Sequence, residues 1–225
     1  MNTTAQQPHF LKHSEVQAYL SQHMPIIIAE SDRGAVLLGL SYIDELLGNF
    51  YEKLLPSEIT KKEKKNILRS FQHLATKTNV ALTCRLLPYS LIQAIDELRS
   101  IRNVIAHRTE VFALTDHENS LRRMFSLLGE GVSTWINHCA VHMMMSNSVN
   151  KVMHAANEDK DPPYFKDEFE VMEFLSGDLE LLDEIGSGQL KWELALGIML
   201  IFAMIIFHRE KVLSLVGDKT LCEIV

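Results

Sequence analysis

The residues best suited to chemistry lie in the run RNVIAH over 102–107, where an arginine and a histidine are separated by four residues. A histidine that titrates near neutral pH can remove the proton of a ribose 2′-hydroxyl or protonate a leaving oxygen. An arginine can bind phosphoryl oxygens while negative charge builds up at phosphorus. These residue types would allow His107 to act as acid or base, Arg102 as phosphate ligand and Asn103 as an orienting neighbour. If the 2′-hydroxyl is the internal nucleophile, this chemistry needs no metal and no cofactor.

Charged residues around the motif complete the predicted site. Two cations are expected to add positive charge for the substrate, and three carboxylates are expected to hold the cations in place. The predicted substrate-binding cations are Arg99 and Arg108, and the supporting acids are Asp44, Glu45 and Asp96.

Helical spacing limits what one copy of the motif can do. On an ideal helix Arg102 and His107 are about 140° apart, whereas Asn103 and His107 lie one turn apart on the same face. Arg102 also falls on an apolar stripe between Leu98 and Ile105, where a guanidinium needs a carboxylate, a phosphate or a partner chain. We therefore expect a homodimer in which a two-fold axis brings two motifs together.

A purely structural role for the motif is the alternative. Arg102 would then pair inside the core with Asp44 or Glu45, which lie on a long helix predicted over 31–55. His107 would hydrogen-bond the carbonyls at the end of its own helix. The motif residues leave catalysis and structure equally open.

The sequence around the motif resembles the HEPN superfamily and, within it, the mannitol-operon-repressor-like branch. The hallmark of the superfamily is R-x4-6-H, commonly with a polar residue directly after the arginine, which is the place of Asn103. The branch is similar to RGAVLLGLSYIDELLGNFYEKLL over 33–55 and to the segment 74–118, which closes on aromatic-x-Leu-Thr-Asp. The resemblance covers about 33–140.

The resemblance implies a helical bundle that dimerises around the motif and, in catalytic members, cleaves RNA without a metal. We expect such a protein to be a toxin or defence component with an RNA substrate. Its expected protein partner is a cognate antitoxin or another regulatory protein. In members with degraded motifs the resemblance implies a transcriptional regulator or co-repressor that acts through protein contacts, and this is the alternative function.

Composition predicts an all-α protein of the cytoplasm. The chain has 225 residues, 47% of them hydrophobic and 23% charged, and few stretches alternate apolar and polar residues with period two. Cys84, Cys139 and Cys222 are irregularly spaced without a CxxC, which indicates reduced thiols. The first residues lack a basic start followed by an apolar run, so no signal peptide is expected.

Patterning divides the chain into three predicted parts. A leader with a short helix covers 1–29, the HEPN-like helical domain covers 30–157, and an acidic linker with a C-terminal helical extension covers 158–225. The stretch 158–184 holds eleven acids and two lysines, and we interpret it as a solvated face. The net charge of -7 argues against tight, non-specific binding of duplex nucleic acid.

Fourteen uncharged residues over 194–207 form the most apolar run of the chain. A membrane span needs about 20 apolar residues, so the run predicts a helix buried in a core or in an oligomer interface. Trp192 before it and Arg209 after it resemble interfacial anchors, which leaves membrane contact as the less favoured alternative.

A histidine pair and a lysine-rich run are weaker indications of binding sites. His138 and His142 have the i, i+4 spacing of zinc ligands, but no third ligand accompanies them, so no metal site is predicted. The run KKEKK over 61–65 is interpreted as a solvated helix face, with a track for the RNA backbone as the alternative.

Overall fold

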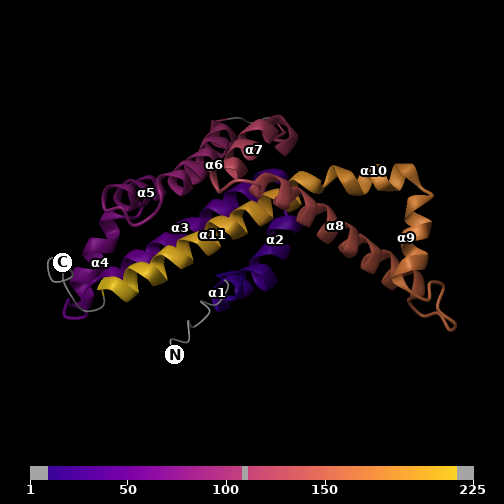
Figure 1. The fold of residues 1–225 in the computed structure, drawn as a ribbon, viewed down its shortest axis with the longest axis horizontal. Helices are drawn as coiled ribbons and strands as arrows, with labels where there is room; N and C mark the ends of the chain where they lie inside the picture. The colour runs from indigo at the N-terminus through magenta and orange to yellow at the C-terminus, as the bar shows by residue number, and fades with distance from the viewer. Residues whose placement is uncertain (1–9, 108–110, 217–225) are drawn as a thin grey trace, which may run out of the picture.

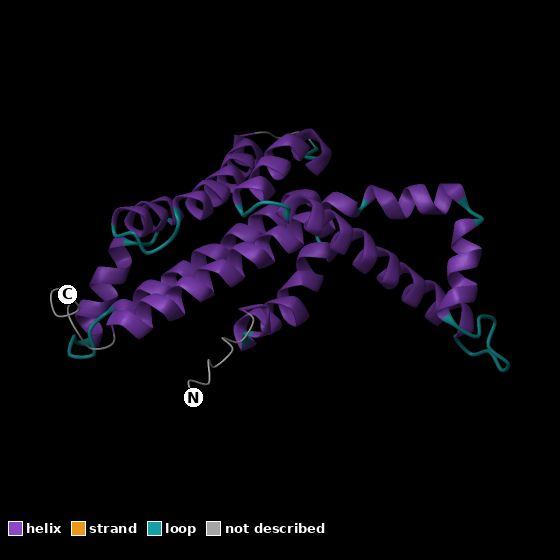
Figure 2. Cartoon of the chain, viewed as in Figure 1, coloured by secondary structure: helices purple, strands orange, loops and turns teal. Residues whose placement is uncertain are grey.

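The computed structural model describes residues 10–107 and 111–216, and helices are the only regular structure in that part of the chain (Figure 2). The all-α fold is therefore confirmed. The helices in chain order are α1 (Ser14–Ala18), α2 (Met24–Ala29), α3 (Asp32–Leu54), α4 (Lys61–Ser70), α5 (Leu74–Thr83), α6 (Tyr89–His107), α7 (Glu118–Leu127), α8 (Val132–Asn157), α9 (Glu168–Ser176), α10 (Leu179–Ser187) and α11 (Gln189–Val216).

Helices α3 and α11 lie side by side and form the long centre of the molecule (Figure 1). Ser31 caps α3 by accepting a hydrogen bond from the Gly34 amide at 3.1 Å. Close approach of the two helices requires a small residue, since a Cβ on Gly39 of α3 would stand 2.2 Å from Ile198 Cδ1 of α11. Because α11 is apolar on nearly all sides, several helices cover it.

Helix α4 contacts α3, and the remaining helices form three groups (Figure 1). Helices α5, α6 and α7 lie on one side, and α1 and α2 lie on another. Helix α8 leaves the bundle, and α9 and α10 return the chain to α11. We call α8, α9 and α10 together the limb. Its outer part has a small core of its own, formed by Val149, Phe165, Val171 and Leu175.

One main core spans residues from Val16 to Ile206. It includes side chains of the predicted leader, of the predicted HEPN-like domain and of the predicted C-terminal extension. Helix α11 contacts α2, α3, α6, α7 and α8, so it belongs to the centre of the bundle. One hydrophobic core therefore draws on all three of the predicted parts.

Helix α11 has the length and composition of a membrane-crossing helix, but 67% of its most apolar window is buried inside the chain. A core helix of a soluble protein has the same character, so α11 is only weak evidence for a membrane. Buried polar groups flank its apolar run. Glu193 before the run binds Arg122, and Arg209 after it binds Glu15.

Candidate functional site

Helix α6 carries the predicted motif and begins at Tyr89, directly after Pro88. Leu91, Ile95 and Leu98 are fully buried and fix its inner face against the bundle. The end of α6 is held by α3, since Arg33 donates a hydrogen bond from Nη2 to the Ile105 carbonyl at 3.2 Å. The last turn of the motif therefore has a defined place beside the start of α3.

Arg102 lies at the edge of the buried face of α6 and not within it. The expectation that it occupies the apolar stripe is wrong, because Ile101 fills the buried position between Leu98 and Ile105. The Arg102 side chain is exposed instead. Because water solvates this guanidinium, it needs no carboxylate to offset a free-energy cost of burial.

Arg99, Arg102 and Asn103 line one pocket of about 400 Å³. The pocket lies where α6 meets α3 and the beginning of α5. The remaining lining residues belong to α3, to the start of α5 and to the connection before α5. They are Leu37, Leu40, Ser41, Asp44, Gln72, His73, Leu74 and Ala75. Three of the predicted site residues and one supporting acid are thus brought together.

The charges of the pocket are compensated except at Arg102. Arg99 forms an ion pair with Asp96 within α6. Asp44 accepts from Lys77 Nζ, which lies 2.9 Å from its Oδ1 and 2.7 Å from its main-chain oxygen. Arg102 has no ion pair or hydrogen bond among the described residues. Its guanidinium is therefore available to an anion.

The pairing expected in the purely structural interpretation does not form. Asp44 binds Lys77, which is 7% exposed on α5, and not Arg102. Glu45 is exposed on α3. The reason is geometric, since a lysine from α5 reaches Asp44 while Arg102 points to the surface.

The remaining motif residues lie at the edge of the described chain. His107 is the last residue of α6, one turn after Asn103, and its side chain is outside the described residues. Arg108 also lies outside the described residues. The predicted roles of both stay predictions.

His73 is a pocket residue that sequence reasoning missed. It is exposed, immediately precedes the first turn of α5, and its Nε2 lies 3.4 Å from Nε2 of Gln72. The N-terminus of α5 adds partial positive charge on the same side of the pocket. No local pattern marks His73, because only the packing of α5 against α3 and α6 brings it to the motif.

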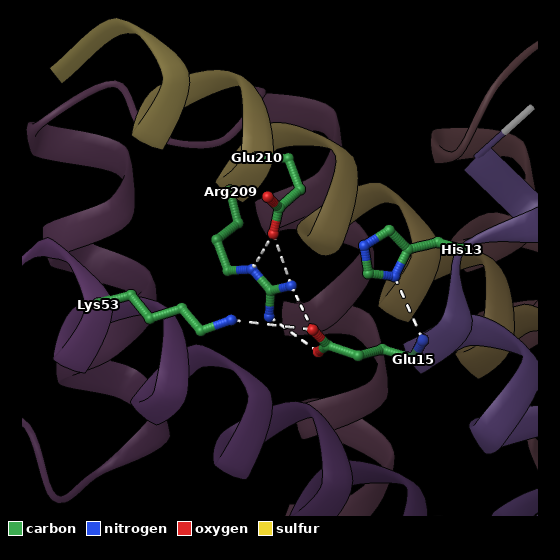
Figure 3. Close-up of polar contacts among 5 residues, drawn as sticks. All are labelled: His13, Glu15, Lys53, Arg209 and Glu210. Carbon is green, nitrogen blue, oxygen red and sulfur yellow. Dashed lines mark hydrogen bonds and ion pairs between the residues drawn. The ribbon is translucent and has the colours of Figure 1, made fainter. Parts of the chain in front are cut away.

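One group of described residues has the spacing of metal ligands, namely His13, Glu15 and Glu210, whose ligand atoms lie within 4.8 Å of one another (Figure 3). A guanidinium already occupies this cluster. Arg209, 1% exposed, donates to Glu15 at 2.9 and 2.6 Å and to Glu210 at 2.9 and 2.8 Å. The hydrogen bonds from Arg209 to Glu15 lower the pKa of the Glu15 carboxyl group. The cluster is therefore a structural ion pair between α1 and α11.

The chain matches no protein-family model, no curated protein and no solved structure. The resemblance to the HEPN superfamily thus rests on the motif and the segments 33–55 and 74–118 alone.

Proposed function

We propose that the pocket between α3, α5 and α6 binds a phosphodiester of RNA, and that the protein is a metal-independent endoribonuclease. The observation that carries this proposal is the exposed, uncompensated Arg102 in one cavity with Asn103, Arg99 and His73. An unpaired guanidinium binds phosphate in bidentate geometry, which is the preferred use of arginine at such sites.

The proposed reaction is an internal transfer at phosphorus. A histidine removes the proton of the 2′-hydroxyl, and the 2′-oxygen attacks the adjacent phosphorus while Arg102 binds the non-bridging oxygens. The bond from phosphorus to the 5′-oxygen breaks, and a protonated imidazole donates a proton to that oxygen. The products are a 2′,3′-cyclic phosphate and a 5′-hydroxyl. Asn103 orients the phosphate through its amide.

Two arrangements supply the imidazoles. His107 lies about 140° around α6 from Arg102, so a homodimer would bring the histidine of one copy to the arginine of the other. His73 offers a second imidazole within the same chain, among the residues that line the pocket. We propose the homodimer as the active form, and an antitoxin or another regulatory protein as the partner of a toxin or defence component.

The thiols favour the cytoplasm as the proposed location. Cys84 and Cys139 are both free, and Cys84 is exposed to solvent. Free exposed thiols persist in the reducing cytosol and are uncommon in secreted proteins.

The test is cleavage of a mixed RNA pool in the presence of EDTA. We expect the wild-type protein to produce 2′,3′-cyclic phosphate ends and His107→Ala to lose this activity. Arg123→Ala is the matched control, since this exposed arginine lies outside the pocket. Cleavage that persists unchanged in Arg102→Ala and in His107→Ala would refute the proposed site.

A non-catalytic regulator or co-repressor is the second candidate. The feature that favours it is the limb, which carries exposed large apolar side chains of the kind that protein contacts use. Equal inactivity of the wild-type protein and of His107→Ala in the cleavage test would favour this function.

A further inference from the structure

The limb concentrates large apolar side chains on the surface. Trp135 and Val141 are exposed on α8, and Phe169, 76% exposed, Met172 and Phe174 are exposed on α9. Aromatic residues and methionine are enriched in protein interfaces, and contiguous exposed apolar surface marks such sites. The limb therefore has the composition of a contact surface.

A groove of about 710 Å³ lies between α8 and α9. Most of the surface that lines the groove is apolar, although several lining residues are polar. The lining residues are Asn137, His138, Val141, His142, Met145, Ser146, Val149, Glu168 and Met172. Trp135 lies one turn before His138 on the same face of α8 and extends this wall. Met145 and Met172 have flexible side chains that adapt to different apolar shapes.

Glu168 brings uncompensated negative charge to the groove. Glu173 and Glu180 line a separate pocket at the corner of α9 and α10, together with Phe174. None of these three carboxylates has an ion pair among the described residues. By contrast, Asp44, Glu97 and Glu193 in the bundle are all ion-paired. Carboxylates of the bundle thus have cationic partners that these three acids of the limb lack.

From the apolar lining and the unpaired acids we infer that this groove binds an amphipathic helix of a partner protein, with lysine or arginine beside its apolar stripe. Apolar residues at i, i+4 and i+7 would enter the groove between α8 and α9, and a cation beside the apolar stripe would meet Glu168. Complementary charge steers such a helix to the limb and rejects acidic helices.

A second copy of the chain fits the groove less well. Its own basic helix, α4, presents Lys61, Lys62 and Lys65 to solvent. Leu68 packs against the core, which leaves Ile67 as the one exposed large apolar side chain of α4 in the described structure. Helix α4 therefore offers the charge but not the apolar residues that the groove requires.

Binding of a labelled synthetic helix of leucine and lysine to the full chain, measured by fluorescence anisotropy, tests the inference. We expect Met172→Ala to weaken binding about fivefold through lost apolar contact, and Glu168→Gln about threefold through lost charge. The matched controls are Leu82→Ala and Glu58→Gln, an exposed apolar residue and an exposed acid outside the limb. Circular dichroism verifies that all four variants fold.

Several results would overturn the inference. Absence of binding, or equal binding by the groove variants and the controls, would show that the groove is not the site. Equal binding of a leucine–glutamate helix would remove the role of the acids. If sedimentation velocity shows self-association of the wild-type chain that Met172→Ala abolishes, the groove belongs to a second copy and not to a partner helix.

Discussion

Arg102 and Arg209 are the same residue type treated in opposite ways by this fold. Arg209 is buried and holds two carboxylates, Glu15 of α1 and Glu210 of its own helix (Figure 3). Arg102 is exposed in a pocket and has no carboxylate partner among the described residues. The comparison separates a charge that fixes packing from a charge that is available to a ligand.

The buried charges of α11 have a clear physical purpose. A helix that is apolar all round has no polar contact within its apolar run that would distinguish one register from another. Glu193 binds Arg122 of α7 and Asn137 of α8, and Arg209 binds Glu15 of α1. Polar contacts at each end of the apolar run are therefore made in one position of α11 relative to its neighbours. We interpret these contacts as the features that define the register of α11.

The largest expected effect on stability is that of Arg209→Ala. Removal of the guanidinium leaves Glu15 and Glu210 side by side, with only Lys53 near Glu15 at 3.8 Å, and loses buried packing. The free energy of unfolding should therefore fall by about 3 kcal/mol. Urea denaturation followed by circular dichroism measures it. The exposed Arg123→Ala should change it by less than about 0.5 kcal/mol. Equal effects of the two substitutions would contradict a structural role for Arg209.

Arg102→Ala should have the reverse pattern. We expect cleavage of RNA to fall about 100-fold or more, the typical cost of removing a donor to a developing oxyanion. The free energy of unfolding should change by less than about 0.5 kcal/mol, because the side chain is exposed and unpaired. Rate measurements in EDTA and urea denaturation of the same preparations check both parts. A large loss of stability would place Arg102 with the structural arginines.

Lys77→Met tests the charge balance of the pocket, and its expected effect on stability lies between those of Arg209→Ala and Arg102→Ala. It leaves the half-buried Asp44 without its partner, so the free energy of unfolding should fall by about 1–3 kcal/mol. The uncompensated carboxylate should also weaken binding of RNA to Arg102. The double variant Asp44→Asn with Lys77→Met should restore binding, because both charges are gone. If the double variant binds as weakly as Lys77→Met, repulsion by Asp44 is not the cause.

The smallest expected effect is a pH dependence that comes from Glu15. Arg209 holds the pKa of Glu15 below its unfolded value of 4.5, so the carboxylate stabilises the fold above pH 4.5. This contribution is lost as the pH falls through the lowered pKa of the folded state. Below pH 4.5 the unfolding free energy of the wild type should therefore fall more steeply than that of Glu15→Gln. Parallel curves for the two proteins would contradict the linkage.

Sequence patterns were sufficient where the determinants are local. The long helix predicted over 31–55 corresponds to α3, and the RNVIAH run indicated Arg102 and Asn103, which line one pocket. The burial of most of the apolar run 194–207 was also predicted. Each of these features depends on residues within a few turns of one helix.

Features made by distant residues were beyond those patterns. The apolar stripe of α6 suggested a buried Arg102, because sequence alone does not show which edge of the stripe faces the bundle. His73 and Lys77 reach the pocket only through the packing of α5. Arg209 was interpreted as a flank of the apolar run, since its partner Glu15 lies 194 residues away. Tertiary packing decides all three.

The most direct test of the central claim is binding of a short RNA with 2′-O-methyl groups, which cannot be cleaved, to the wild-type protein, Arg102→Ala and Arg123→Ala. We expect Arg102→Ala alone to weaken binding, by about tenfold or more, because it removes a charged hydrogen-bond donor to phosphate. Equal affinity of all three folded proteins would contradict the assignment of Arg102 as the ligand-binding arginine.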